Sequence, residues 1–409
     1  MPTSADDVYF TNLGTNGCTV DAAIDIASLN IAAGYTGTFD NATNNQAITI
    51  AGDVIMDGSA VSMGAATWTT SGSFDCKDVG TFNRNASTLV MNGTGKNLSG
   101  VNAYTGRFNS ITVNGDTIIT TFTYSSGNLN VNATLTLSVS IIFYSYGPIS
   151  VGAGKKITGA GELRLVGNSG RIATMDGTID NVSVWIRGSH TTNPALVAGT
   201  YDWPTIYVKN DAVTNDTKRL GSGNIILSGN LYVQTTGTGT LTLDNATDNP
   251  NITVKGNLTI SENTGVITWT KGTGTLTFNG TTAQAIDFMG LTVEAINVTN
   301  TSAIVTFATN GFTGTSLTAS AGASMKFQAT KTFAFTTLSL DGTSGSLITL
   351  ASTTGGSAFL FNITTAPTVS YVSVSDSNAS GGAAITTSAS TDGGGNTNWI
   401  FFVPKIINY

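Results

Sequence analysis

Few residues of this chain could act as a nucleophile or a general base. The 409 residues include 1 His and 2 Cys. His190 lies in Gly188-Ser-His-Thr-Thr192 without an accompanying triad signature, so we expect a histidine in an exposed loop. Cys18 and Cys76 have no neighbouring His or second Cys, and we expect free, buried thiols, with one disulfide as the alternative. With a single His, a zinc site of the usual kind is not available.

Carboxylates are the remaining candidates for acid–base chemistry, as in the paired acids of glycosidases. Most Asp residues lie among Gly, Asn and Ser, which is typical of turns, where solvent holds an Asp pKa near about 3.9. A general acid near neutral pH needs a raised pKa. We therefore expect no catalytic activity, with a polysaccharide-cleaving site as an alternative. The carboxylates considered are Glu162, Glu262 and Glu294 and the pairs Asp176/Asp180, Asp211/Asp216 and Asp244/Asp248.

Aromatic and basic residues offer candidate contacts for a partner or a glycan. Between Trp185 and Gly223 the strand pattern breaks, and this stretch holds two prolines, which are unwelcome inside a ladder. Trp203, near Tyr201, is the aromatic residue that we expect to be exposed, whereas Trp269 should belong to the core. The candidate contacts are His190, Tyr201, Trp203, Lys218, Arg219 and, near the C-terminus, Trp399, Phe401 and Phe402.

Loops that bind nucleotides or metals are not indicated. Gly152-Ala-Gly-Lys-Lys-Ile157 lacks the Ser or Thr of a P-loop and has Ile149 where a P-loop has glycine. Asp392-Gly-Gly-Gly-Asn396 lacks a calcium-binding repeat and is typical of a turn. We expect no cofactor and no metal.

Charge is scarce and unevenly distributed. Charged residues make up 10% of the chain, against about 25% in ordinary soluble proteins. Acidic residues (24) outnumber basic ones (17), which argues against nucleic acid as a partner, and no apolar run of about 18 residues is present to span a membrane. Residues 1–76 contain eight Asp and no Lys or Arg. This end is either a solvated acidic face or a surface that docks on a basic partner or binds cations.

Alternation of apolar and polar residues is the main structural signal. From Leu129 to Phe143 apolar residues occupy the odd positions and mostly polar residues the even ones, which predicts half-buried strands with a tight bend near Asn132. Helical periodicity is almost absent, and we expect less than about 10% helix. Shorter strand-like runs recur at Ile111/Val113, Leu231/Val233, Leu241/Leu243, Ile252/Val254, Leu258/Ile260, Leu276/Phe278, Leu291/Val293, Phe333/Phe335 and Leu338/Leu340.

Short units repeat along the chain. Many short strands at such spacing predict an all-β fold, a parallel β-helix (β-solenoid) rod of stacked short-strand coils, with two stacks or a β-sandwich array as alternatives. Asn and Thr at equivalent outward positions should form ladders from coil to coil. The repeats are Ser126–Val131 with Ser228–Val233 and Lys255–Ile260, Gly237–Asn245 with Gly272–Gly280, and Thr88–Thr94 plus Phe108–Val113 with Thr275–Thr281 plus Gly290–Val293.

Composition divides the chain into five parts. Terminal coils of a solenoid have unpaired edges, so we expect the first and last parts to be contact surfaces. Deletion of the last part should change solubility or oligomeric state. The parts are an acidic N-terminal β region or cap (residues 1–76), a first solenoid stretch (77–185), an excursion or seam (186–223), a second solenoid stretch (224–398) and an apolar C-terminal tail (399–409).

The pattern Thr275-Leu-Thr-Phe-Asn-Gly-Thr281, followed by a short strand, resembles repeats of right-handed parallel β-helix proteins of phage virions and bacterial surfaces. Asn109-Ser-Ile111 and Leu291-Thr-Val293 depart from the usual Asn-Leu of these repeats. The resemblance implies a fibre, spike, decoration or adhesin type of protein and assigns no catalytic residue. Two further stretches share it, Cys18–Asp21 with Ala27–Thr38 and Val369–Asp376 with Asp392–Phe401.

These observations leave three functions. We expect a non-enzymatic structural protein of a phage virion (fibre, spike or capsid decoration) at the virion surface. Its partners would be other virion proteins or copies of itself, a trimer among them, and a host-surface glycan. Residues 1–7 lack the basic and apolar regions of a secretory signal, which virion proteins do not need. A bacterial secreted or surface adhesin is the alternative, and a polysaccharide-degrading tailspike is the third.

Overall fold

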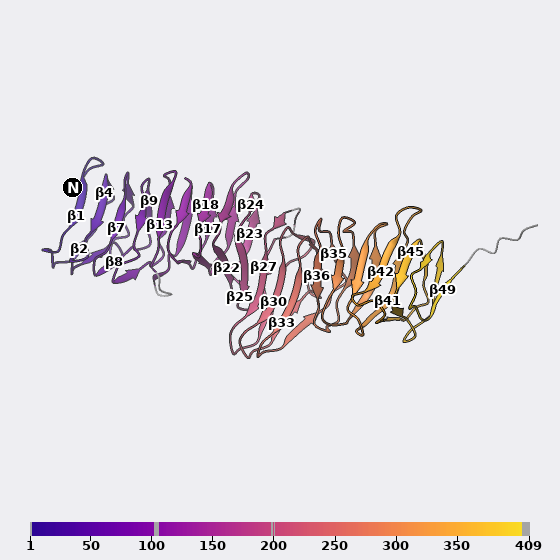
Figure 1. Ribbon diagram of the computed structural model, residues 1–409. Coiled ribbons are helices and arrows are strands. Elements are labelled where there is room, and N and C mark those ends of the chain that lie inside the picture. The colour runs from indigo at the N-terminus through magenta and orange to yellow at the C-terminus, as the bar shows by residue number, and fades with distance from the viewer. Residues whose placement is uncertain (1, 102–105, 198, 200, 403–409) are drawn as a thin grey trace, which may run out of the picture. The chain divides into compact units, whose positions relative to one another are not determined.

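The computed structural model describes residues 2–101, 106–197, 199 and 201–402 (Figure 1). Over these residues the chain is all-β, and no α-helix is present. Its strands are parallel and stack as a β-solenoid of about 18 turns. The predicted fold, with little helix, is therefore confirmed. The chain divides into two compact units, Met1–Val197 and Ala198–Tyr409.

In the first unit, each turn contributes successive strands to different parallel sheets. Sheet A has the order β1 (Asp7–Phe10), β4 (Ser28–Ile31), β7 (Val54–Met56), β10 (Phe74–Asp75), β13 (Lys96–Ser99), β15 (Thr117–Ile119), β18 (Thr134–Leu137), β21 (Lys156–Gly159) and β24 (Thr178–Ile179). Sheet B has β2 (Cys18–Thr19), β5 (Thr38–Asp40), β8 (Ala60–Ser62) and β11 (Thr81–Asn83). Sheet C has β3 (Ile24–Ile26), β6 (Ile48–Ile50), β9 (Thr67–Thr70), β12 (Thr88–Met91), β14 (Ser110–Val113), β17 (Leu129–Val131), β20 (Ile149–Val151) and β23 (Ile172–Met175). Sheet D has β16 (Thr123–Ser125), β19 (Ile142–Ser145), β22 (Glu162–Val166) and β25 (Ser183–Arg187).

The second unit repeats this arrangement, and its two longest strands have 8 and 9 residues. One sheet has the order β27 (Ile206–Asn210), β30 (Leu231–Thr235), β33 (Leu258–Glu262), β36 (Gln284–Asp287), β38 (Val305–Phe307), β40 (Ser324–Phe327), β42 (Ile348–Ser352), β45 (Val372–Ser375) and β48 (Thr391–Asp392). Sheet E has β26 (Asp202–Trp203), β29 (Asn224–Leu227), β32 (Asn251–Val254), β35 (Thr275–Phe278), β37 (Ala295–Val298), β39 (Phe312–Ala319), β41 (Thr332–Leu340), β43 (Phe359–Ile363) and β46 (Ser377–Asn378). Sheet F has β28 (Asp216–Lys218), β31 (Leu241–Asp244) and β34 (Ile267–Thr270), and sheet G has β44 (Thr368–Ser370), β47 (Ile385–Ser388) and β49 (Trp399–Phe401).

Alternation within the strands explains the core. In β14, Ile111 and Val113 point inward and are buried, while Ser110 and Thr112 are partly exposed. Ile111 is in register with an inward leucine on each neighbouring strand, Leu89 of β12 and Leu129 of β17. Each such side chain stabilises the fold by about 1.5–3 kcal/mol when it is fully buried. The core is therefore a column of apolar side chains that lengthens with every turn.

Polar and aromatic ladders run along the outside of the first unit, as predicted for asparagine. Asn114 donates from Nδ2 to Asn92 Oδ1 at 2.9 Å, and Asn132 donates to Asn114 Oδ1 at 3.0 Å. On sheet D the rings of Tyr124 and Tyr144 stack with centroids 4.5 Å apart. These contacts join successive turns without using paired charges, which accounts for the scarcity of charged residues.

Two strand predictions were wrong in detail. The run from Leu129 to Phe143 is divided among β17, β18 and β19, and Val139 lies in the turn before β19, 72% exposed. Leu291/Val293 is no strand, because only the intervening Thr292 makes an isolated bridge, to Thr313. The bend near Asn132 is confirmed, since it separates β17 from β18.

Sequence repeats did not always mark equivalent positions in the stack. Gly237–Asn245 supplies β31 of sheet F, whereas its sequence counterpart Gly272–Gly280 supplies β35 of sheet E. In the longer repeat, β14 pairs with β12, and the strand that pairs with β35 is β37, just after Gly290–Val293. Similar sequence units can thus form strands of different sheets of the solenoid.

Candidate functional site

His190 is buried, so the expectation of an exposed loop histidine was wrong. Its Nδ1 lies 2.9 Å from the carbonyl oxygen of Gly188, and its Nε2 lies 3.1 Å from the carbonyl oxygen of Gly170, one turn earlier. The ring fills space between two turns, and a neutral ring donates its one N–H to one of these two carbonyls. This places His190 in the packing of the first unit.

Trp203 is also buried, which corrects its predicted exposure. In the two-residue strand β26, Asp202 points outward and Trp203 inward, with no exposed surface on Trp203. Tyr201 is half-buried and meets the Trp203 ring edge-on at 6.3 Å. Trp269 belongs to the core, as expected. The face of Trp203 that a sugar would need is thus covered by the protein.

The basic pair Lys218-Arg219 is held in ion pairs. Lys218 is fully buried, and its Nζ lies 3.0 Å from Asp216 Oδ2. Arg219 donates from Nε to Asp248 Oδ2 at 2.9 Å. The proposed acid pairs Asp211/Asp216 and Asp244/Asp248 therefore each contribute one carboxylate to an ion pair with a base.

Glu294, one of the carboxylates that the sequence offered for acid–base chemistry, is buried. It accepts hydrogen bonds from Asn245 Nδ2 at 3.0 Å, Trp269 Nε1 at 2.8 Å and the Gly272 amide at 3.0 Å. Three donors from two earlier turns replace the hydration of this carboxylate. Glu294 therefore links turns of the second unit.

At the C-terminal end, the three predicted contact residues differ in exposure. Trp399 is only 9% exposed, its ring lies parallel to that of Phe361 at 6.4 Å, and its Nε1 donates to Ser377 Oγ at 3.0 Å. Phe401 is half-buried and Phe402 is 65% exposed. Residues 403–409 of the predicted tail lie outside the described residues. Trp399 thus closes the core, and Phe402 is the apolar contact that stays on the surface.

The first turn of the first unit is covered on one side only. Four of the side chains that point inward from β1, β2 and β3 are half-buried, whereas Ile26 of β3 is buried and the register partners of the four, one turn later, are at most 2% exposed. Exposed aspartates surround this turn. The half-buried residues are Val8, Phe10, Cys18 and Ile24, their partners are Leu29, Ile31, Phe39 and Ile48, and the aspartates are Asp6, Asp7, Asp21 and Asp25. The turn presents an apolar, strand-edged surface with an acidic rim.

Both cysteines are free thiols. Cys76 is buried, as expected, and burial strongly raises the pKa of its thiol. Cys18 in the first turn is only half-buried, and burial followed by the charge of Asp21 raises its pKa. A raised pKa lowers the thiolate fraction and hence the reactivity of both residues.

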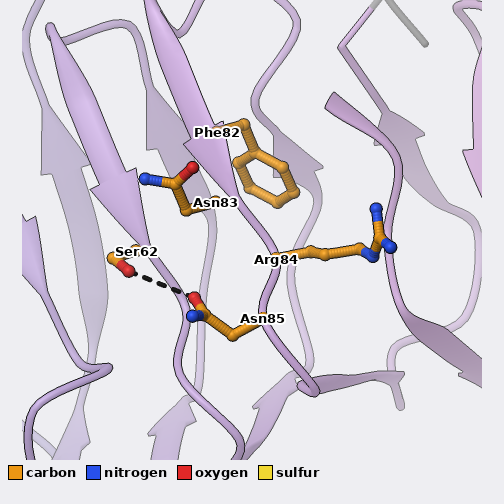
Figure 2. Close-up of a pocket in the computed structure, with 5 residues that line it drawn as sticks. All are labelled: Ser62, Phe82, Asn83, Arg84 and Asn85. Carbon is orange, nitrogen blue, oxygen red and sulfur yellow. Dashed lines mark hydrogen bonds between the residues drawn. The ribbon is translucent and has the colours of Figure 1, made fainter. Parts of the chain in front are cut away.

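Two hollows lie on the surface of the first unit. Figure 2 shows the first, of about 300 Å³, which is lined by Ser62, Phe82, Asn83, Arg84 and Asn85. Ser62 Oγ donates to Asn85 Oδ1 at 3.1 Å, and Phe82 at its base is only 6% exposed. This hollow offers a ligand mainly polar groups.

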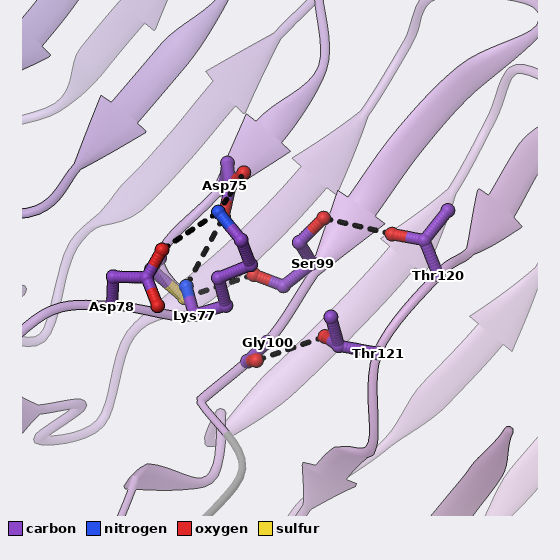
Figure 3. Close-up of polar contacts among 8 residues, drawn as sticks. Asp75, Lys77, Asp78, Ser99, Gly100, Thr120 and Thr121 are labelled. Carbon is purple, nitrogen blue, oxygen red and sulfur yellow. Dashed lines mark hydrogen bonds and ion pairs between the residues drawn. The ribbon is translucent and has the colours of Figure 1, made fainter.

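The second hollow combines charged, hydroxyl and apolar side chains. It has a volume of about 340 Å³ and is lined by Lys77, Asp78, Thr120, Thr121, Phe122 and Ile141. The polar part is drawn in Figure 3, where Ser99 Oγ and Thr120 Oγ1 lie 2.8 Å apart and Thr121 Oγ1 donates to the Gly100 carbonyl at 2.9 Å. The sequence does not reveal this site because Lys77 and Phe122 are two turns apart in the chain.

The charges beside this hollow are coupled. Lys77 Nζ lies 2.8 Å from Asp78 Oδ2 and 3.0 Å from Asp75 Oδ2, and hydrogen bonds to Asp78 and then Asp75 raise the lysine pKa. Burial raises the pKa of Asp57, opposed by Lys77 and reinforced by Asp78 and Asp75. The ammonium is therefore fixed between two carboxylates at the edge of the hollow.

Comparisons with protein-family models, curated proteins and solved structures found no match to this chain. Within the described ranges, no three His, Cys, Asp or Glu side chains are grouped so that they could hold a metal ion. The same residues include no helix long and apolar enough to cross a membrane.

Proposed function

We propose that this chain is a non-enzymatic structural protein at the surface of a phage virion, as a fibre, a spike or a capsid decoration. The observation that carries the proposal is the first turn, where Phe10 and Ile24 are half-buried inside a rim of aspartates and where β1 and β3 each pair, among the described residues, with a strand on one side only. Unpaired edges are a template for pairing with another chain. A basic, strand-edged surface of a second virion protein fits this turn.

The disposition of the ionisable side chains supports a structural role. Lys218, Arg219 and Arg164 are each paired with a carboxylate of the same chain, and Glu294 is saturated by donors. The Arg219–Asp248 pair and the hydrogen bonds of Glu294 join different turns, whereas the pairs of Lys218 and Arg164 each lie within one strand. The stack thereby gains a defined register, as a rigid surface protein needs.

Labelling of native particles tests this proposal. Antibodies against the purified chain, detected with gold in electron micrographs of the source culture, should mark phage particles at a fixed position. Labelling confined to bacterial envelopes would instead support an adhesin. Release of new reducing ends from host polysaccharide by the purified chain would support the degrading tailspike.

A further inference from the structure

We propose that the hollow between Lys77 and Phe122 is a binding subsite for a neutral pyranose, one sugar unit of a surface polysaccharide. Its volume of about 340 Å³ lies at the small end of the range of ligand sites, about 300–1,000 Å³. Its lining combines polar and apolar side chains, as ligand sites do. This inference extends the proposed function to a ligand. It is tested on the purified chain and does not depend on where the chain resides.

The polar side of the hollow matches a pair of neighbouring hydroxyls. Lys77 uses two ammonium protons for Asp75 and Asp78, and the third has no acceptor in the part of the chain that the structure describes. Among the described residues, Asp78 Oδ1 accepts no hydrogen bond, and the side chain of Asp78 is 62% exposed. A hydroxyl is the group that accepts from an ammonium and donates to a carboxylate at the same time, and charged partners make both bonds strong. Two adjacent hydroxyls of a sugar ring supply two groups that can each accept from the ammonium and donate to the carboxylate.

The hydroxyl of Thr121 adds a third polar contact. Because its proton is donated to the Gly100 carbonyl, Oγ1 presents its lone pairs and acts as an acceptor. The bond between Ser99 and Thr120 holds the neighbouring hydroxyl in place. The polar groups are therefore oriented before a ligand arrives, which reduces the entropy lost on binding.

The lining of the hollow also has an apolar part. Phe122 and Ile141 line it, and both are half-buried, so part of each side chain faces the solvent. A pyranose has a C–H face that can cover an aromatic ring while its hydroxyls reach the polar side. The hollow of Figure 2 lacks this feature, because Phe82 is covered.

The charges select a neutral ligand. Asp57, Asp75 and Asp78 outnumber Lys77, so an anionic sugar would be repelled. A cation would have to compete with the ammonium of Lys77 for the same carboxylates. Hydroxyls can accept from the ammonium of Lys77 and donate to the carboxylates, and they leave the ion pairs between these groups in place.

Saturation-transfer NMR on the purified chain tests the subsite. The probes are the methyl glycosides of glucose, galactose, mannose and N-acetylglucosamine, with cyclohexanol as an apolar ring of one hydroxyl. We expect transfer to the ring C–H protons of at least one glycoside. Asp78→Ala should weaken its binding by about tenfold or more, the usual effect of losing a hydrogen bond to a charged group. Phe122→Leu should weaken it by a smaller factor.

The matched control is Asp25→Ala, which removes an exposed aspartate of the first turn. It should leave binding unchanged, and circular dichroism should show all three variants folded. The inference is overturned if no glycoside receives saturation, if Asp78→Ala and Asp25→Ala bind alike, or if cyclohexanol competes as well as the glycosides. Because particle labelling is unaffected by these results, failure of the subsite and failure of the virion assignment can be told apart.

Discussion

The ammonium of Lys218 lies 3.0 Å from the carboxylate of Asp216, and both side chains point into the second unit from the same short strand, β28. Thr217 between them points outward. A charge that leaves water is costly unless a partner compensates for the lost hydration. The fold therefore tolerates these two buried charges because each compensates for the lost hydration of the other. Neither side chain is suited to contact an outside ligand.

Replacing Lys218 by methionine should destabilise the second unit by about 3 kcal/mol, because Asp216 then keeps a largely buried charge without its ion-pair partner. The double variant Lys218→Met/Asp216→Asn should recover part of this loss. Urea unfolding of the full chain, followed by circular dichroism, measures both. Equal midpoints for Lys218→Met and the native chain would show that the pair contributes nothing to stability.

The fold could be predicted from the sequence because alternation specifies which residues point inward. Ile111 and Val113, for example, are buried as expected, and Asn114 and Asn132 form the expected ladder. Alternation is a local property, so it needs no knowledge of distant turns. It failed at Val139, where a turn continued the apolar–polar pattern by chance.

The candidate sites could not be predicted in the same way. Trp203 and Lys218 lie in strands of two and three residues, too short to show which face is inside. The hollow beside Lys77 joins Lys77 and Asp78 to residues that follow them by 42 or more positions, and nothing in either segment marks the other. The number of residues per turn decides which side chains meet, and that number varies along this chain.

Two buried tryptophans should respond differently to replacement by phenylalanine. Trp68 Nε1 donates to the Met63 carbonyl at 2.9 Å, whereas Trp203 Nε1 is buried and has no acceptor among the described residues. Trp68→Phe loses a buried hydrogen bond to the Met63 carbonyl, which keeps only the bond from Asn41 Nδ2 at 3.0 Å, while Trp203→Phe removes an unsatisfied donor. We expect Trp68→Phe to cost about 1 kcal/mol more than Trp203→Phe. Thermal unfolding of each variant against the native chain measures the difference, and the reverse order would refute the argument.

The free energy of unfolding should fall as the pH rises through the range in which Asp57 ionises. Burial raises the pKa of Asp57 above the ordinary value of an aspartate, so the folded state binds its proton more tightly than the unfolded state does. Stability contributed by the protonated form is present below the unfolded pKa and is lost as the pH rises through the folded pKa. Asp57→Asn should therefore raise the unfolding midpoint at neutral pH and change it little in strong acid.

Asp40 provides the control of opposite sign. The hydroxyl of Thr43 and backbone amides lower its pKa, so its contribution is present above the unfolded pKa and is lost as the pH falls through the folded one. Asp40→Asn should lower the midpoint at neutral pH. If both variants shift the midpoint in the same direction, the assigned causes are wrong.

The exposed phenylalanine after β49 should promote self-association. Phe402 is 65% exposed and Ile400 is 45% exposed, so two large apolar side chains lie close together in sequence at the C-terminal end of the second unit. Phe402→Ser should weaken association about tenfold or more if the ring is buried between copies, since burial of a phenylalanine is worth about 1.5–3 kcal/mol. Sedimentation velocity over a concentration series measures this. Val139→Ser, which removes a 72% exposed side chain from a turn of the first unit, is the matched control and should have no effect. Trp399→Ser should instead lower thermal stability, because Phe361 loses its stacked ring and Ser377 its donor. Identical sedimentation of Phe402→Ser, Val139→Ser and the native chain would mean that this end forms no contact between copies.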